Sequence, residues 1–149
     1  MCMGHFQGEI PVIPAFLLLG EKPIPFLPIV DTGCTRTILS YQIAEIAGID
    51  LKSLRKEQIG GIGGKSYVRE LNREISIGLL DEEAGGVKKI HVEPLDYVYF
   101  FEKKDEKNPS LVGWDILSRF ELCFNKQQND INLKRLNVLP KNHKILIKS

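Results

Sequence analysis

The sequence lacks the features that mark membrane, nucleic-acid-binding and secreted proteins. Its 20 Lys and Arg residues are nearly balanced by 19 Asp and Glu residues, so no strong attraction to nucleic acid or anionic membrane is expected. The apolar run at residues 10–19 contains two prolines and is shorter than the ~20 residues that cross a bilayer. No charged segment followed by a long apolar stretch begins the chain, so we expect no signal peptide and a cytoplasmic location.

The cysteines are few and form no recognisable pattern. Cys2, Cys34 and Cys123 have no C-x-x-C spacing and cannot all pair within the chain, which favours a reducing compartment. The three histidines form no H-x-x-x-H pair, so we expect neither a zinc site nor another cofactor. A nucleophilic pair of Cys34 and His91 is conceivable, although a lone cysteine beside a turn is more often a small buried apolar residue.

Strand patterns dominate the rest of the chain. With 149 residues, 43% of them hydrophobic, the chain fits a single domain spanning residues 1–149. Strands are predicted at residues 10–19, 24–30, 35–39, 71–80, 87–92, 96–101, 120–125 and 130–136, with a further exposed strand at 144–148. Prolines in the first two should make them edge strands, bulged or bent. The predicted fold class is all-β with two short helices, closed and barrel-like.

Two segments have helical patterns. At residues 40–48, Ser40 is placed to cap the first turn and Gly48 to end the helix in a left-handed conformation. At residues 113–120, Trp114, Leu117 and Phe120 recur at three-residue spacing and predict one apolar stripe.

A single acidic triplet, Asp31-Thr32-Gly33, follows the apolar run at residues 24–30. Two carboxylates about 3 Å apart share one proton, so one can take a proton from water while the other polarises a carbonyl. No second Asp-Thr-Gly or Asp-Ser-Gly occurs, and the simplest source of a second carboxylate is another copy of the chain. Taken alone, the triplet favours a turn aspartate that accepts its own backbone N–H groups.

Two further segments follow in order. The first is the glycine cluster Gly60-Gly61-Ile62-Gly63-Gly64, and the second is the segment 111–117, Leu-Val-Gly-Trp-Asp-Ile-Leu. Together with the acidic triplet, this order over residues 9–125 resembles the retropepsin-like aspartic proteases. These are single-domain, mostly β peptidases that work as homodimers and are related to the retroviral proteases.

The resemblance implies a role for each acidic-triplet residue. Asp31 would be the catalytic carboxylate, one per subunit. The Thr32 hydroxyl would bond across the twofold axis, and Gly33 would permit the turn conformation and let substrate approach. In the third segment, Gly113 and Asp115 would support the catalytic loop, although Asp115 fits a simple helix cap equally well.

The glycine cluster would form the tip of a flap that closes over bound peptide. Glycines at residues 60–64 would supply positive φ angles, flexibility and backbone groups that bond an extended substrate. The simpler interpretation is a plain hairpin turn, but four glycines in five residues exceed what one turn needs.

The sequence departs from the retroviral pattern in two places. Trp114 stands where the family carries arginine, and Cys34-Thr35-Arg36 replaces small and acidic residues after the triplet. The ion pair that ties loop to helix is therefore absent, and apolar packing by Trp114 is the expected substitute. Arg36 either selects acidic substrate side chains or is an exposed structural arginine.

The predicted function is an aspartic endopeptidase with an Asp–Asp dyad across a homodimer axis, acting on a peptide or protein substrate with an activated water. The main alternative is a catalytically silent dimer that binds extended peptides by strand addition. A P-loop is disfavoured because its first glycine falls at Ile59, and a subtilisin-like enzyme because no serine motif is present. Residues 145–147 are a candidate dimer strand.

Overall fold

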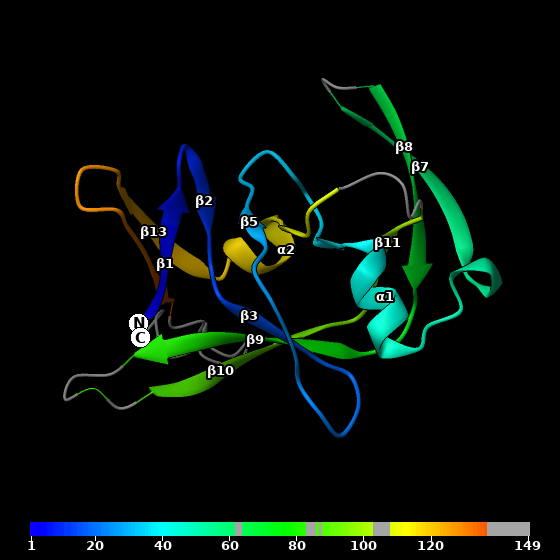
Figure 1. Cartoon of the computed structure of the whole chain (residues 1–149), viewed down its shortest axis with the longest axis horizontal. Coiled ribbons are helices and arrows are strands. Elements are labelled where there is room, and N and C mark those ends of the chain that lie inside the picture. Colours follow the sequence, from blue (N-terminus) through cyan, green and yellow to red (C-terminus); the bar gives the residue numbers. More distant parts are fainter. Residues whose placement is uncertain (62–63, 83–85, 87, 103–107, 137–149) are drawn as a thin grey trace, which may run out of the picture.

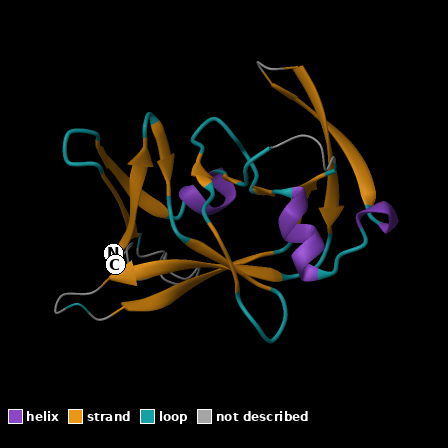
Figure 2. Ribbon diagram, in the orientation of Figure 1, coloured by secondary structure: helices purple, strands orange, loops and turns teal. Residues whose placement is uncertain are grey.

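The computed structural model describes residues 1–61, 64–82, 86, 88–102 and 108–136 (Figure 1). Strands make up most of it, with two α-helices and one 3-10 turn (Figure 2). The strands are β1 (Cys2–Gln7), β2 (Ile10–Val12), β3 (Ala15–Leu18), β4 (Ile24–Phe26), β5 (Ile29–Val30), β6 (Ile38–Leu39), β7 (Arg55–Gly61), β8 (Gly64–Leu71), β9 (Ile75–Glu82), β10 (Lys88–Leu95), β11 (Val98–Phe101), β12 (Leu111–Val112), β13 (Phe120–Asn125) and β14 (Asp130–Arg135). The helices are α1 (Tyr41–Ala47) and α2 (Trp114–Leu117), with η1 at Leu51–Ser53.

The strands hydrogen-bond in the order β4-β3-β9-β1-β2-β5-β12-β6-β11-β8-β7, while β10 pairs with β9 and β13 with β14. The mostly β class with two helices is confirmed, but the described strands do not close into a barrel as expected. At one end of this order, β4 contains Pro25, which has no N–H to offer a further strand. At the other end, the β7–β8 hairpin rises away from the body of the molecule (Figure 1).

The prolines divide each of the two N-terminal apolar runs into two strands, where single edge, bulged or bent strands were predicted. Pro14 separates β2 from β3, and Pro28 separates β4 from β5. The strand predicted at 71–80 is present as β9, but its bounds are shifted, because Leu71 ends β8 and β9 begins at Ile75. Strand β1 was not predicted, because its sequence is only weakly apolar. Its close approach to β2 requires glycine at position 4, where a Cβ would lie 2.2 Å from the Val12 carbonyl oxygen.

Both predicted helices are present, but their ends differ in detail. Gly48 ends α1 with φ 70°, as predicted, whereas the Ser40 side chain makes no capping hydrogen bond. In α2, Ile116 and Leu117 are fully buried, but Trp114 is 42% exposed and does not belong to an apolar stripe. None of the described helices is long and apolar enough to cross a membrane. The predicted segments 144–148 and 145–147 lie outside the described residues.

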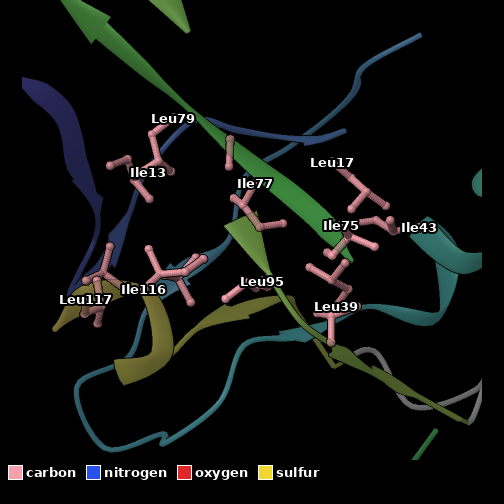
Figure 3. Packing of buried hydrophobic residues seen from close by; sticks show 14 of the residues in the cluster. Ile13, Leu17, Leu39, Ile43, Ile75, Ile77, Leu79, Leu95, Ile116 and Leu117 are labelled. Carbon is pink, nitrogen blue, oxygen red and sulfur yellow. The ribbon is translucent and has the colours of Figure 1, made fainter. Parts of the chain in front are cut away.

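Helix α2 packs into the interior beneath the long strand β9 (Figure 3). Aliphatic side chains from β3, β6, β9, β10, α1, α2 and the link between β2 and β3 form one buried cluster. Among its members are Ile13, Leu17, Leu39, Ile43, Ile75, Ile77, Leu79, Leu95, Ile116 and Leu117. Burying each such side chain contributes about 1.5–3 kcal/mol to folding, so this cluster fixes α2 firmly in place.

A buried carboxylate ties β10 to the C-terminal hairpin. Glu93 is 2% exposed, and its oxygens accept hydrogen bonds from Arg119 Nη1 at 3.1 Å and Arg135 Nε at 3.0 Å. His91 Nε2 also bonds this carboxylate. Burial acts to raise the pKa of Glu93, but the hydrogen bonds from Arg135, Arg119 and His91 outweigh it and hold that pKa below its ordinary value.

Candidate active site

Asp31 lies immediately after β5, at a point fixed by a parallel strand pair. Strand β5 pairs with β12 through Ile29 and Leu111 and through Val30 and Val112. The Asp31 N–H extends this ladder by donating to the Val112 carbonyl oxygen at 3.0 Å. The buried strands therefore set the position of the Asp31 backbone.

The Asp31 side chain is oriented by its own turn. Its Oδ1 accepts the Gly33 N–H at 2.9 Å, and its carbonyl oxygen accepts the Cys34 N–H at 3.2 Å. This is the turn geometry that the sequence allowed as an alternative, and it leaves the second oxygen, Oδ2, without a hydrogen-bond partner among the described residues. The half-buried carboxylate forms no ion pair in that part of the chain, so it is oriented without being neutralised.

Gly33 lies beside the Asp31 carboxylate, where a side chain would take up space. Among the described glycines, positive φ angles occur at Gly8, Gly48 and Gly86, so Gly33 is not in a left-handed conformation. A Cβ on Gly33 would lie 3.3 Å from Asp31 Oδ1. Glycine at this position thus keeps the space beside the carboxylate open.

Helix α2 holds the loop of residues 31–37, here called the Asp31 loop, from the side. The Trp114 N–H donates to the Cys34 carbonyl oxygen at 2.9 Å, and the Asp115 N–H donates to that of Thr35 at 3.2 Å. The indole Nε1–H of Trp114 donates to the Thr32 carbonyl oxygen. The helix and loop are therefore joined by hydrogen bonds, whereas the sequence predicted apolar packing by Trp114.

Gly113 allows the close approach that these bonds require. A Cβ at this position would lie 2.7 Å from three backbone atoms of the loop, namely the carbonyl carbon and oxygen of Arg36 and the carbonyl oxygen of Cys34. Backbone atoms at that distance cannot move aside as a flexible side chain can. Only glycine fits at the start of α2 with the loop in this conformation.

Thr37 is the supporting residue that sequence reasoning missed. It is fully buried, its Oγ1–H donates to Asp115 Oδ1 at 2.7 Å, and its N–H donates to Asp115 Oδ2 at 2.9 Å. The same Oγ1 accepts the Gly113 N–H at 3.2 Å. The available signal was a hydroxyl directly before the apolar pair Ile38 and Leu39, because a buried hydroxyl needs partners.

A cleft of about 370 Å³ opens above the carboxylate. It lies between the Asp31 loop and the β7–β8 hairpin, whose strands pair through Gly60 and Lys65 and through Gly61 and Gly64. Its lining residues are Asp31, Gly33, Cys34, Ile38, Ile59, Gly60, Ser66, Phe101, Asn108 and Leu111. The cleft thus combines one carboxylate with mostly apolar walls.

The glycine cluster lies on this hairpin, as its sequence indicated. Gly60 lines the cleft, but its φ is not positive and a Cβ there would meet nothing within 4 Å, so the expected need for left-handed backbone is wrong at this position. Gly61 and Gly64 form the last pair of the ladder. Ile62 and Gly63 lie outside the described residues.

Cys34 and His91 do not form a nucleophilic pair. The Cys34 Sγ–H donates to the Arg36 carbonyl oxygen at 2.9 Å, and His91 bonds Glu93 in the separate cluster described above. Burial, opposed by that hydrogen bond and aided by the Asp31 charge, raises the pKa of Cys34. The thiol therefore stays protonated near neutral pH, which makes it a poor nucleophile.

The Arg36 side chain is exposed, and its guanidinium carbon lies 4.9 Å from the centre of the Tyr97 ring. Within the described residues, no group of three or more His, Cys, Asp or Glu side chains is arranged to hold a metal ion.

No protein-family model and no curated protein matches this sequence. Among solved structures, a retropepsin-like aspartic protease from Rickettsia conorii is 17% identical, with a TM-score of 0.56 over 88% of this chain and 95% of that one. EIAV protease in complex with the inhibitor HBY-793 is 17% identical, with a TM-score of 0.43 over 75% of this chain and 88% of that one. The retroviral protease-like domain of Ddi1 from Leishmania major is also 17% identical (TM-score 0.44, covering 91% and 98%). The match to the Rickettsia structure, together with the element order described above, shows that this chain has the retropepsin-like fold of aspartic proteases.

Proposed function

We propose that this protein is an aspartic endopeptidase whose active site forms between two copies of the chain. One observation carries the proposal. Asp31 presents a carboxylate from a firmly held loop, beneath a mostly apolar cleft, and its Oδ2 has no hydrogen-bond partner among the described residues. A carboxylate in that setting is suited to acid–base chemistry on a bound water.

The second carboxylate is proposed to be the Asp31 of another copy. Of the described residues that line the cleft, Asp31 alone is acidic. The nearby Asp115 is occupied by two hydrogen bonds from Thr37. A homodimer with its twofold axis beside Asp31 supplies the missing group without another chain type.

The proposed reaction is direct hydrolysis of a peptide bond. The two Asp31 carboxylates hold one proton between them, because like charges about 3 Å apart cannot both ionise. The ionised carboxylate takes a proton from water while the water oxygen bonds to the scissile carbonyl carbon, and the protonated carboxylic acid donates to the carbonyl oxygen. Transfer of a proton to the nitrogen then breaks the C–N bond and releases an acid and an amine.

The remaining site residues are proposed to bind and position substrate. The walls formed by Ile38, Ile59, Phe101 and Leu111 favour apolar side chains of an extended peptide. Thr32 and Gly33 would hold the carboxylate in place, and the glycine cluster at residues 60–64 would cover the peptide backbone.

The test is cleavage of a peptide library at acidic and neutral pH, with products identified by mass spectrometry. Wild-type protein should cut, and Asp31→Asn should reduce cleavage about 10³-fold or more, since it removes a reacting group. Asp130→Asn, on the remote hairpin of β13 and β14, is the matched control and should cut normally. A statine-type transition-state mimic should block the wild type.

The same experiment addresses the alternative of a silent peptide-binding dimer. If the wild type binds extended peptides but cleaves none of them at any tested pH, the endopeptidase proposal is wrong. If cleavage persists in the Asp31→Asn variant, the activity does not use the proposed dyad.

A further inference from the structure

Trp114 makes an unusual contact for an aromatic side chain at the start of a buried helix. Its helix neighbours Ile116 and Leu117 are fully buried, yet Trp114 remains 42% exposed. Its indole N–H donates to the carbonyl oxygen of Thr32, which lies 82 residues earlier in the chain. The contact joins α2 to the centre of the Asp31 loop.

The Thr32 oxygen belongs to a rigid group that reaches the Asp31 side chain. A peptide unit is planar and trans, so the carbonyl oxygen of Thr32 and the N–H of Gly33 lie in one rigid plane and point in opposite directions. That Gly33 N–H donates to Asp31 Oδ1 at 2.9 Å. A hydrogen bond that holds the Thr32 oxygen therefore also fixes the direction of the N–H that orients the carboxylate. Donation to the carbonyl further polarises the peptide and strengthens its N–H as a donor.

We propose that Trp114 is a positioning residue, whose indole N–H orients the Asp31 carboxylate through the Thr32–Gly33 peptide. The proposal rests on the proposed endopeptidase function. In this proposal the uncharged indole N–H of Trp114 joins α2 to the Asp31 loop. The exposed tryptophan thereby supports catalysis without contacting substrate.

The kinetic consequence follows from the position of the side chain. Trp114 is not among the described residues that line the cleft, so its loss should leave KM nearly unchanged. Misplacement of a catalytic group by about 1 Å costs about 100-fold in rate, so kcat should fall by roughly 10- to 100-fold. A looser carboxylate also couples less strongly to its partner, which narrows the pH–rate profile.

Because the chain contains one tryptophan, the indole N–H can be replaced without changing any other residue. Growth of a tryptophan auxotroph on 3-benzothienylalanine substitutes sulfur for that N–H and keeps the bicyclic ring. Incorporation of 7-azatryptophan, which retains the N–H, is the matched control. We expect reduced kcat, unchanged KM and a narrowed pH profile with the first analogue, and near wild-type values with the second.

Three results would overturn the proposal. These are an unchanged kcat and pH profile with 3-benzothienylalanine, an equal loss of activity with 7-azatryptophan, and a change in KM that matches the change in kcat. The last two would indicate that the ring contributes only packing or substrate contact.

A second measurement does not depend on activity. In protein labelled with ¹⁵N-tryptophan, the single indole N–H should exchange with deuterium more slowly than free indole does. The Gly33 amide signal should shift when 3-benzothienylalanine is incorporated. If the wild type cleaves nothing but both effects appear, the proposed function fails while the positioning contact stands. If neither effect appears, the positioning contact is refuted.

Discussion

Replacement of Thr37 by valine tests whether the buried hydroxyl holds the Asp31 loop to α2. Valine has nearly the same shape as threonine but cannot make the 2.7 Å bond to Asp115 Oδ1 or accept the Gly113 N–H at 3.2 Å. A hydrogen bond to a charged group contributes about 1.5–3 kcal/mol, and a neutral one about 0.5–1.5 kcal/mol. The backbone bond from the Thr37 N–H to Asp115 Oδ2 remains.

The expected loss is about 3 kcal/mol of unfolding free energy, since both former partners are left without the hydroxyl and the added methyl group offsets part of the cost. For a chain of this size, each kcal/mol shifts Tm by about 2–4 °C, so Tm should fall by roughly 6–12 °C. Urea titration and thermal unfolding, followed by tryptophan fluorescence at one fixed protein concentration, measure both quantities.

Two control variants separate the hydroxyl from other effects. Thr37→Ser keeps the hydroxyl and loses one buried methyl group, and should cost about 1 kcal/mol. Thr35→Val makes the same chemical change at an exposed position two residues earlier, and should change stability by less than about 0.5 kcal/mol. If Thr37→Val unfolds within about 0.5 kcal/mol of wild type, the hydroxyl does not hold the loop and the reasoning is wrong.

Three further predictions concern the helix, the subunits and the Glu93 cluster. Gly113→Ala should destabilise the fold by about 1–3 kcal/mol in urea titration, because its Cβ would lie 2.7 Å from loop backbone atoms. Gly20→Ala is the control and should leave the unfolding free energy nearly unchanged, because a Cβ there meets nothing within 4 Å. If both variants lose the same unfolding free energy, the steric argument is wrong. If subunits exchange freely, an equal mixture of wild-type and Asp31→Asn chains should have about one quarter of the activity of wild type at the same total chain concentration, because random pairing makes that share of the dimers wild type. An activity of about one half would indicate that each chain works independently. Glu93→Gln should cost about 3 kcal/mol, because its arginine partners lose their counter-charge. Because the folded pKa of Glu93 lies below its ordinary value of 4.5, its stabilisation is present above that pH and is lost as pH falls through the folded pKa. Unfolding free energies measured across acidic pH should therefore fall more steeply in wild type than in the variant.

Features set by local chemistry were predictable from the sequence. The run that ends at Val30 places Asp31 at a turn, and the glycine at position 48 ends α1 in a left-handed conformation, since glycine adopts positive φ without strain. The hairpin of β13 and β14 was located to within a residue because its two strand segments lie on either side of a polar turn. In each case the residues that determine the feature lie within a few positions of it.

Features set by distant contacts were not predictable. Thr37 gains its importance from Asp115, 78 residues later, and the indole of Trp114 from Thr32, 82 residues earlier. Strand β1 is held by β2, β9 and β14 rather than by its own weak apolar pattern. Tertiary pairing overrides local preference in such strands, so sequence patterns alone do not reveal them.

The origin of the loop contacts bears on how the proposed activity would depend on concentration. Val112, Gly113, Trp114 and Asp115 of the same chain all hydrogen-bond the Asp31 loop. We expect these bonds to hold the loop within a single copy, so that under the proposed function the second copy contributes chiefly the second carboxylate. Folding and activity should then separate on dilution, because the unfolding transition depends on contacts within one chain whereas cleavage follows the fraction of chains that are paired. Specific activity should fall below the dimer dissociation constant while far-UV circular dichroism remains that of the folded protein. Simultaneous loss of both signals would mean that the chain cannot hold its loop alone.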